Sequence, residues 1–241
     1  MKAWPRMCAS TALFLGLAGL VCAAETPRYE TNKVEGWTVM VDTRLPAEHE
    51  AATGTALKLI GVQLREIAHE VPAPAVAKLR EVILWFSPEY PDVKPRAEYH
   101  PDAGWLREHG RNPAMAKGVE FTDVDTFEQE MSRMPNFVLH ELAHAYHDRV
   151  LSGGFDNAEI KAAFERARAG QIYERVERRW GNGRPNTFER AYAMTNPMEY
   201  FAESTEAFFS QNDFFPFTRE ELKRHDRAME QLLVRVWGGT K

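Results

Sequence analysis

The chain has 241 residues, of which 44% are hydrophobic and 27% are charged, as is usual for a soluble globular protein with one substantial core. Its 30 basic and 35 acidic side chains give a formal net charge of −5, and the basic residues form no continuous run. Nucleic acid is therefore not an expected partner, because binding to a phosphate backbone needs concentrated positive charge.

The first 24 residues have the pattern of an export signal. Two basic residues precede an apolar run from residue 11 to residue 21, and small residues follow, ending in Ala24. This arrangement predicts cleavage after Ala24 and a mature protein that is secreted or periplasmic. A membrane anchor is the alternative, although the run is about half of the ~20 residues that a spanning helix needs. A lipoprotein is also less favoured, since Val21 precedes Cys22 where a small residue is usual.

Both cysteines, Cys8 and Cys22, lie within the predicted signal. The mature chain, residues 25–241, would then contain no thiol, and a core of this size does not need disulfides. Any metal must therefore be held by His, Asp or Glu. We expect residues 25–241 to form one domain, with no stable membrane association once the signal is removed.

The N-terminal half of the mature chain predicts a small mixed sheet. Residues 36–41 alternate and include β-branched side chains, and residues 82–86 form a continuous apolar run, so both segments predict strands. Between them, apolar positions recur every three or four residues after Pro46. This spacing predicts a long helix that ends at Pro72.

Residues 87–113 are rich in proline, glycine and charge, and they predict the longest irregular stretch of the chain, of the kind that often borders a site. Residues 97–100 and 118–122 predict short strands. An edge strand here could pair with an extended peptide through backbone hydrogen bonds. A plain sheet edge is the alternative.

The C-terminal half predicts mainly helices. A short helix over residues 126–133 precedes Asn136, which is a suitable N-cap for the next helix. Asn196 and Pro197 suit the cap and first position of a later helix that should end near Ser210. Further helices are expected over residues 158–168 and 171–179 and, from a capping box at Thr218 and Glu221, near the C-terminus. The predicted fold class is therefore α+β.

The most informative stretch is His140-Glu141-Leu142-Ala143-His144, an HExxH pattern on a predicted helix. Residues four apart on a helix project side by side, so both imidazoles could reach one ion at about 2.0–2.1 Å. Glu141 is rotated by about 100° from His140 and would stand beside the metal, where a general base belongs. Two histidines that simply form hydrogen bonds are the alternative.

A third metal ligand must come from elsewhere in the chain. A metzincin motif would continue with glycine at 147 and a ligand at 150, but the chain has His147 and Val150. Glu199 is the better candidate, because it lies in the first turn of the later helix with Glu203 one turn further along. Glu203 could then accept a hydrogen bond from the second nitrogen of a ligand histidine. A solvated charged face of this helix is the alternative.

The HELAH pattern and the later Glu-Tyr-Phe-Ala-Glu sequence of residues 199–203 together resemble the gluzincin metallopeptidases, in particular the family of the anthrax lethal factor catalytic domain. The resemblance spans residues 136–210 and rests on motifs. It implies a zincin-like fold with the active-site helix below the cleft and a Zn²⁺ ion held by His140, His144 and Glu199. It further implies Glu141 as the base and Glu203 as the outer partner of a ligand histidine.

The same resemblance implies a role for Tyr192, which lies seven residues before Glu199. In that family a tyrosine at this spacing is thought to stabilise the oxyanion or to assist the leaving group. A phenol near such an oxyanion can donate a hydrogen bond to it. A packing role within Ala191-Tyr192-Ala193 is the alternative.

These patterns predict an exported zinc-dependent metallopeptidase that hydrolyses a peptide or protein substrate with a zinc-bound water activated by Glu141. The alternatives are a catalytically silent zinc-binding scaffold and a hydrolase of a non-peptide amide. Glu141 argues against the scaffold, because a structural metal site has no use for a base. His147 could approach the site from the same helix, and His100 with Tyr99 could line the cleft.

Overall fold

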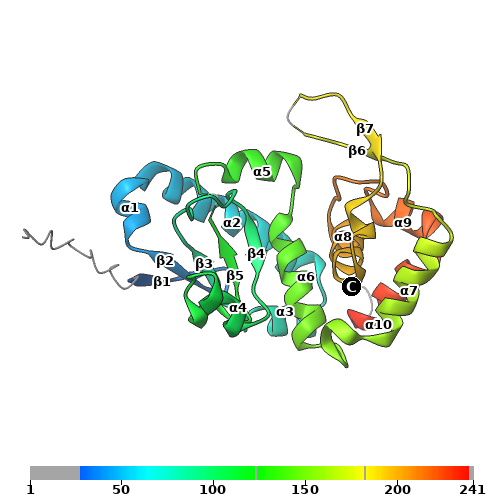
Figure 1. Cartoon of the computed structure of the whole chain (residues 1–241), viewed down its shortest axis with the longest axis horizontal. Helices are drawn as coiled ribbons and strands as arrows, with labels where there is room; N and C mark the ends of the chain where they lie inside the picture. The colour runs from blue at the N-terminus through cyan, green and yellow to red at the C-terminus, as the bar shows by residue number, and fades with distance from the viewer. Residues whose placement is uncertain (1–27, 123, 182, 239–241) are drawn as a thin grey trace, which may run out of the picture.

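A five-stranded mixed sheet occupies the N-terminal part of the computed structural model, which describes residues 28–122, 124–181 and 183–238 (Figure 1). Its strands are Tyr29–Val34 (β1), Trp37–Asp42 (β2), Leu84–Phe86 (β3), Ala97–Tyr99 (β4) and Val119–Phe121 (β5). They lie in the order β1-β2-β3-β5-β4. The three middle strands are parallel, whereas β1 and β4 run antiparallel to their neighbours. The predicted export signal lies outside the described residues.

The middle of the sheet is apolar because both of its faces are covered. Leu84 and Phe86 are fully buried, and Trp85 on the opposite face is only 5% exposed. Continuous apolar runs are typical of such strands, and the strands predicted over residues 36–41 and 82–86 are confirmed. The sequence pattern does not predict β1, because its residues are mostly polar and only partly buried. Its full-length pairing with β2 nevertheless makes it a strand.

The long helix predicted after Pro46 is divided in two. Helix α1 (Arg44–Glu48) ends at His49, and α2 (Glu50–Glu70) then continues to the predicted end before Pro72. α3 (Ala73–Leu79) follows directly. Within residues 87–113, β4 confirms the strand predicted over residues 97–100, whereas the short helix α4 (Ala103–Glu108) was not predicted. Asp102 starts α4 by accepting a hydrogen bond from the Trp105 amide at 2.8 Å. The turn η1 (Pro113–Met115) leads into β5.

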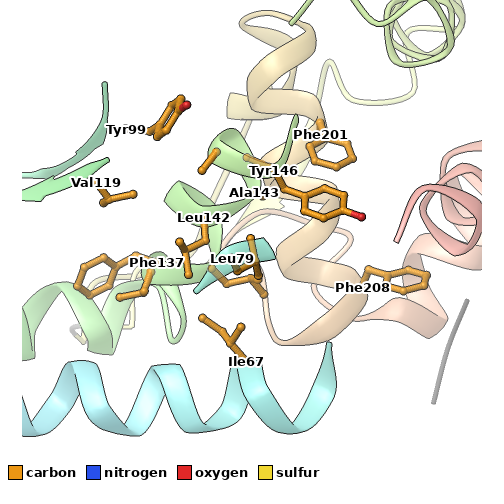
Figure 2. Packing of buried hydrophobic residues seen from close by; sticks show 14 of the residues in the cluster. Ile67, Leu79, Tyr99, Val119, Phe137, Leu142, Ala143, Tyr146, Phe201 and Phe208 are labelled. Carbon is orange, nitrogen blue, oxygen red and sulfur yellow. The ribbon is translucent and has the colours of Figure 1, made fainter. Parts of the chain in front are cut away.

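Helix α6 (Phe137–Arg149) lies at the centre of the molecule, between the sheet and the C-terminal helices (Figure 1). It follows α5 (Phe127–Arg133) and packs on α2. In Figure 2, Leu142 of α6 points toward α2, which carries Ile67, while Phe201 lies on the neighbouring C-terminal helix. The ring of Phe137 instead packs on Phe121 of β5 and Phe127 of α5. α6 is buried nearly all round, so its position is fixed by packing on several sides.

The C-terminal half is a group of helices around α8 (Pro197–Phe209), which packs against α6 and against α7 (Ala158–Ala169). The single helix predicted after Thr218 is two helices, α9 (Arg219–His225) and α10 (Arg227–Val236). They are separate because Asp226 leaves the helical conformation and caps α10, accepting from the Met229 amide at 3.1 Å. No helix within the described residues has both the length and the apolar character needed to cross a bilayer.

The helix predicted over residues 171–179 is wrong. Val176–Arg178 (β6) instead pairs antiparallel with Thr187–Glu189 (β7) to form a hairpin that projects from the C-terminal helices (Figure 1). Only Tyr173 and Val176 of the predicted helical stripe are buried, too few to hold a helix against the core. The Asn-Gly pair at residues 182–183 was the missed signal, because this dipeptide favours hairpin connections.

Candidate metal centre

Two capped helices bring the candidate ligands together. Asn136 starts α6 by accepting a hydrogen bond from the Leu139 amide at 3.1 Å, which puts His140 in the second turn of the helix. Asn196 starts α8 in the same way, and Pro197 occupies the first helical position. The start of α8 lies against the side of α6, so Glu199 in its first turn faces the two histidines.

The three predicted ligands form one group. Nε2 of His140 lies 3.1 Å from Oε2 of Glu199, and Nε2 of His144 lies 3.3 Å from the same oxygen. The two Nε2 atoms are 3.1 Å apart. Tetrahedral zinc with bonds of about 2.0–2.1 Å holds its ligand atoms about 3.3 Å from one another. The donor set and the three separations therefore fit a zinc ion that retains an open fourth position.

Glu206 is the outer hydrogen-bond partner of His140. The prediction that Glu203 has this role is wrong. Nδ1 of His140 donates to Oε1 of Glu206 at 2.6 Å, whereas Oε1 of Glu203 lies 3.8 Å away. Helix geometry explains the difference. Glu206 lies seven residues after Glu199 and therefore points in almost the same direction from the helix. Glu203 lies four residues after Glu199 and is rotated from it by about 40°. The carboxylate fixes the proton on Nδ1 and leaves Nε2 as the metal-facing atom.

The charges of the centre are arranged to receive a cation. Burial alone would lower the pKa of His140, but hydrogen bonds to Glu199 and Glu206 raise that pKa well above the usual value for histidine. Burial would raise the pKa of Glu199, but the two imidazoles hold it well below its usual value. The site thus stabilises positive charge between Nε2 of His140, Nε2 of His144 and Oε2 of Glu199. A divalent ion can take the place of the proton there.

Behind His140 lies a buried group of three carboxylates, Glu203, Glu206 and Asp213. Burial raises the pKa of all three, and for Glu206 to about 7. Arg133 and Arg178 offset part of this charge through ion pairs with Asp213 at 3.2 and 3.3 Å. One oxygen each of Glu203 and Glu206 has no hydrogen bond with any described residue. A cation at His140 would compensate this group further.

Glu141 is held by the edge strand of the sheet. Its Oε2 accepts a hydrogen bond from the backbone amide of Tyr99 at 2.8 Å. The Tyr99 hydroxyl donates to Asp148 of α6 at 2.6 Å. Tyr99 therefore attaches β4 to α6 through both its backbone amide and its side chain. The Tyr99 amide therefore orients the Glu141 carboxylate, and by fixing Oε2 it also fixes the direction of Oε1. Sequence patterns contained no sign of this contact, because it joins residues 42 positions apart.

Two hollows meet at the histidines, and His140, Glu141 and Tyr192 line both of them. We call the smaller one, of about 280 Å³, the Tyr99 cleft; its walls include Tyr99, His144, Phe155, Met198 and Glu199. We call the larger one, of about 540 Å³, the basic cleft; its walls include Lys94, Arg96, Arg133, Arg178 and Arg184. The candidate centre therefore lies in the middle of a continuous depression.

Tyr192 lines both hollows beside His140 and Glu141. It belongs to the single turn η3 (Tyr192–Met194), which packs on α8, and its side chain is half exposed in the depression. Partial burial and then the negative charge of Glu199 raise the pKa of its phenol. The phenol therefore stays protonated and able to donate a hydrogen bond.

The remaining candidate histidines lie outside the ligand group. His147 is fully buried, its ring packs on Phe155 and Phe201, and neither ring nitrogen bonds to a described residue. His100 points away from the depression and forms a buried pair with Glu120 at 2.8 Å. Of the two residues proposed to line the cleft, Tyr99 does so and His100 does not.

No protein-family model, curated protein or solved structure matches the chain. The function is therefore argued from the residues of the centre and the space around them.

The two outer carboxylates can be separated by experiment. Glu206→Gln should weaken zinc affinity about tenfold or more, because the hydrogen bond to Nδ1 of His140 loses its charged acceptor. Glu203→Gln should change it less, since the Glu203 oxygen lies 3.8 Å from Nδ1 of His140 and makes no hydrogen bond with it. Competitive titration with a chromophoric chelator measures both affinities. Equal losses in the two variants would contradict the assignment to Glu206.

His147 should make stability depend on pH. Burial lowers its pKa to about 4, below the ~6.5 of an unfolded histidine. Between these values the unfolded chain binds more protons, so stability is complete above pH 6.5 and falls as the pH drops toward 4. The loss should reach about 3 kcal/mol, because one pKa unit is worth about 1.4 kcal/mol.

His147→Leu keeps a similar volume and removes the titration. Urea unfolding of both proteins, without metal, from pH 4 to pH 7.5 isolates the effect as their difference, since other groups titrate equally. Parallel pH curves for the two proteins would show that His147 does not contribute.

Proposed function

We propose that the protein is an exported zinc metallopeptidase of gluzincin type with a zincin-like fold. The observation that carries the proposal is the group of His140, His144 and Glu199, whose donor atoms lie 3.1–3.3 Å apart. Glu141 supplies a carboxylate beside that group, with one oxygen held by the Tyr99 amide. A structural zinc site is usually closed by four protein ligands, whereas three ligands and an adjacent base are typical of hydrolysis.

Bound at these residues, zinc would polarise a carbonyl group and lower the pKa of water toward ~7. The chain's own groups supply the rest of the chemistry. Glu141 accepts the proton of the attacking water through the oxygen that Tyr99 leaves available, and later delivers it to the leaving nitrogen. Tyr192 donates a hydrogen bond to the oxygen that gains negative charge. Glu206 holds the imidazole of His140 in one tautomer and one orientation.

A peptide substrate has a place to bind along β4. Arg96 and His100 form backbone hydrogen bonds with the β5 side of the sheet, at 3.0 Å each. Neighbouring residues of a strand point to opposite edges, so Ala97 and Tyr99 face the free edge beside the centre. The Tyr99 amide is used by Glu141, which leaves the amide and carbonyl groups of Ala97 for an extended peptide.

Glu141→Gln tests the base. The variant should retain stoichiometric zinc, because the ligands are unchanged and the glutamine oxygen still accepts from Tyr99. Its hydrolysis of a peptide library should fall by about 10²–10⁴-fold, the usual contribution of a general base. Glu199→Ala should instead lose zinc affinity, and Glu159→Gln, on the exposed face of α7, should change neither property.

Zinc content by atomic emission and cleavage by mass spectrometry give the two measurements. Stoichiometric zinc in the wild type with no peptide cleavage would favour a zinc-binding scaffold and reject the peptidase. A wild-type protein that binds no zinc would reject both.

Tyr192→Phe tests the hydrogen-bond donor. The change removes only the hydroxyl, so kcat should fall about 10²-fold while KM and zinc affinity stay close to wild type, because the bond forms chiefly in the transition state. Tyr146→Phe is the matched control, since its hydroxyl bonds to the Val236 carbonyl on the other side of α6. Steady-state kinetics that show the same kcat for Tyr192→Phe and wild type would assign Tyr192 to packing.

A further inference from the structure

The basic cleft holds positive charge that its own carboxylates do not neutralise. Arg133 is fully engaged, by Glu130 at 2.6 Å and by Asp213 at 3.2 Å. Arg178 shares the same Asp213 and has only a distant second partner, Glu189, at 3.8 Å. Lys94, at the rim, forms no ion pair with any described residue. The cleft therefore offers cations to a bound group.

Arg178 is the cation best prepared to bind an anion. Its guanidinium lies 3.9 Å from the ring centre of Trp180 and 4.6 Å from that of Phe214, and Nε donates to Asp213. These contacts fix the plane of the group, and the side chain remains 19% exposed on the cleft wall. Its Nη atoms make no hydrogen bond with a described residue. A rigid fork of free donors is suited to a carboxylate.

The direction of β4 decides which part of a peptide would enter this cleft. The chain runs from Lys94 and Arg96 at the basic cleft to Tyr99 at the other hollow. Antiparallel pairing is the more stable arrangement, so a bound peptide should run opposite to β4. Its N-terminal part then lies in the Tyr99 cleft, and the residue following the cleaved bond lies in the basic cleft.

The β6–β7 hairpin and α5, which both line the basic cleft, also touch one another. Gly181, in the loop of the β6–β7 hairpin, touches the end of α5 so tightly that a Cβ atom there would overlap the carbonyl oxygen of Ser132. Trp180 and Arg184 from the hairpin, and Glu130 and Arg133 from around α5, form the walls below this contact. A peptide that enters the cleft from β4 therefore lies between the hairpin and α5.

We propose that the basic cleft selects peptides that carry a carboxylate on the residue directly after the cleaved bond, and that Arg178 binds this carboxylate. The inference rests on the proposed peptidase function, because only a peptidase has a cleaved bond that defines this position. The carboxylate could belong to an acidic side chain or to the end of the chain. Both present the same two oxygens to the guanidinium.

Binding to the zinc-loaded Glu141→Gln protein tests the preference without turnover. The probes are two blocked hexapeptides of alanine that differ only in glutamate or glutamine at the fourth position, and two short peptides that end there as a free acid or an amide. The acidic member of at least one pair should bind about tenfold more tightly, as expected for a hydrogen bond to a charged group. The pair that shows the difference identifies the source of the carboxylate.

Substitutions then assign the preference to Arg178. Adding Arg178→Gln should abolish the difference within each pair, and Arg178→Lys should restore part of it because the charge returns. Arg175→Gln is the matched control, since Arg175 lies on the same hairpin against Phe188 and outside the cleft. Lys94→Gln alters an exposed side chain and should lower the preference severalfold, which keeps the test valid if Arg178→Gln does not fold.

The results separate this inference from the peptidase function. Equal binding of the acidic and neutral members of both pairs would overturn the inference, even if the wild type cleaves peptides. A preference that depends on Arg178 would support carboxylate binding in the basic cleft, even if the wild type cleaves nothing and the peptidase function fails. In a cleaving protein, mass spectrometry of library products should show acidic residues or chain ends after the cut. Acidic residues found only before the cut would overturn the proposed orientation.

Discussion

The contact between the imidazoles of α6 and the carboxylates of α8 is the interaction on which the rest of the site depends. Glu199 and Glu206 are two turns apart on α8, and both face His140, one at each of its ring nitrogens. Burying two carboxylates on an otherwise apolar helix is costly unless positive charge faces them. The same pair of helices thus forms a large part of the core and brings together residues that could hold a cation.

The sheet positions the Glu141 carboxylate, whereas the candidate ligands and Glu141 itself belong to helices α6 and α8. β4 is anchored on its outer face by Arg111 bonding to Glu98 and by the pair of His100 and Glu120, and on its inner face by the Tyr99 hydroxyl. An edge strand held on both faces can direct one backbone amide accurately. The Tyr99 amide bonds to Glu141. The ion pairs of Glu98 and His100 therefore help to orient Glu141, although they do not contact the centre.

Much of the centre could be predicted from sequence because its signals are local. The HExxH spacing, the caps Asn136 and Asn196 and the strand of residues 82–86 each depend on neighbours within a few residues. The parts that could not be predicted depend on distant pairing. The β6–β7 hairpin was mistaken for a helix because two buried residues fit a helical stripe. Glu203 and Glu206 lie on one carboxylate stripe of α8, and only the packing of α8 on α6 decides which of them bonds to His140.

The contact of Gly181 with Ser132 has a consequence for the size and shape of what can be processed. The contact joins the β6–β7 hairpin to α5, two elements that line the basic cleft, so a wide folded segment would meet it more readily than a thin one. Extended tails, linkers and chain ends are thin enough to enter. On the proposed function, extended chains would therefore be processed more readily than folded domains.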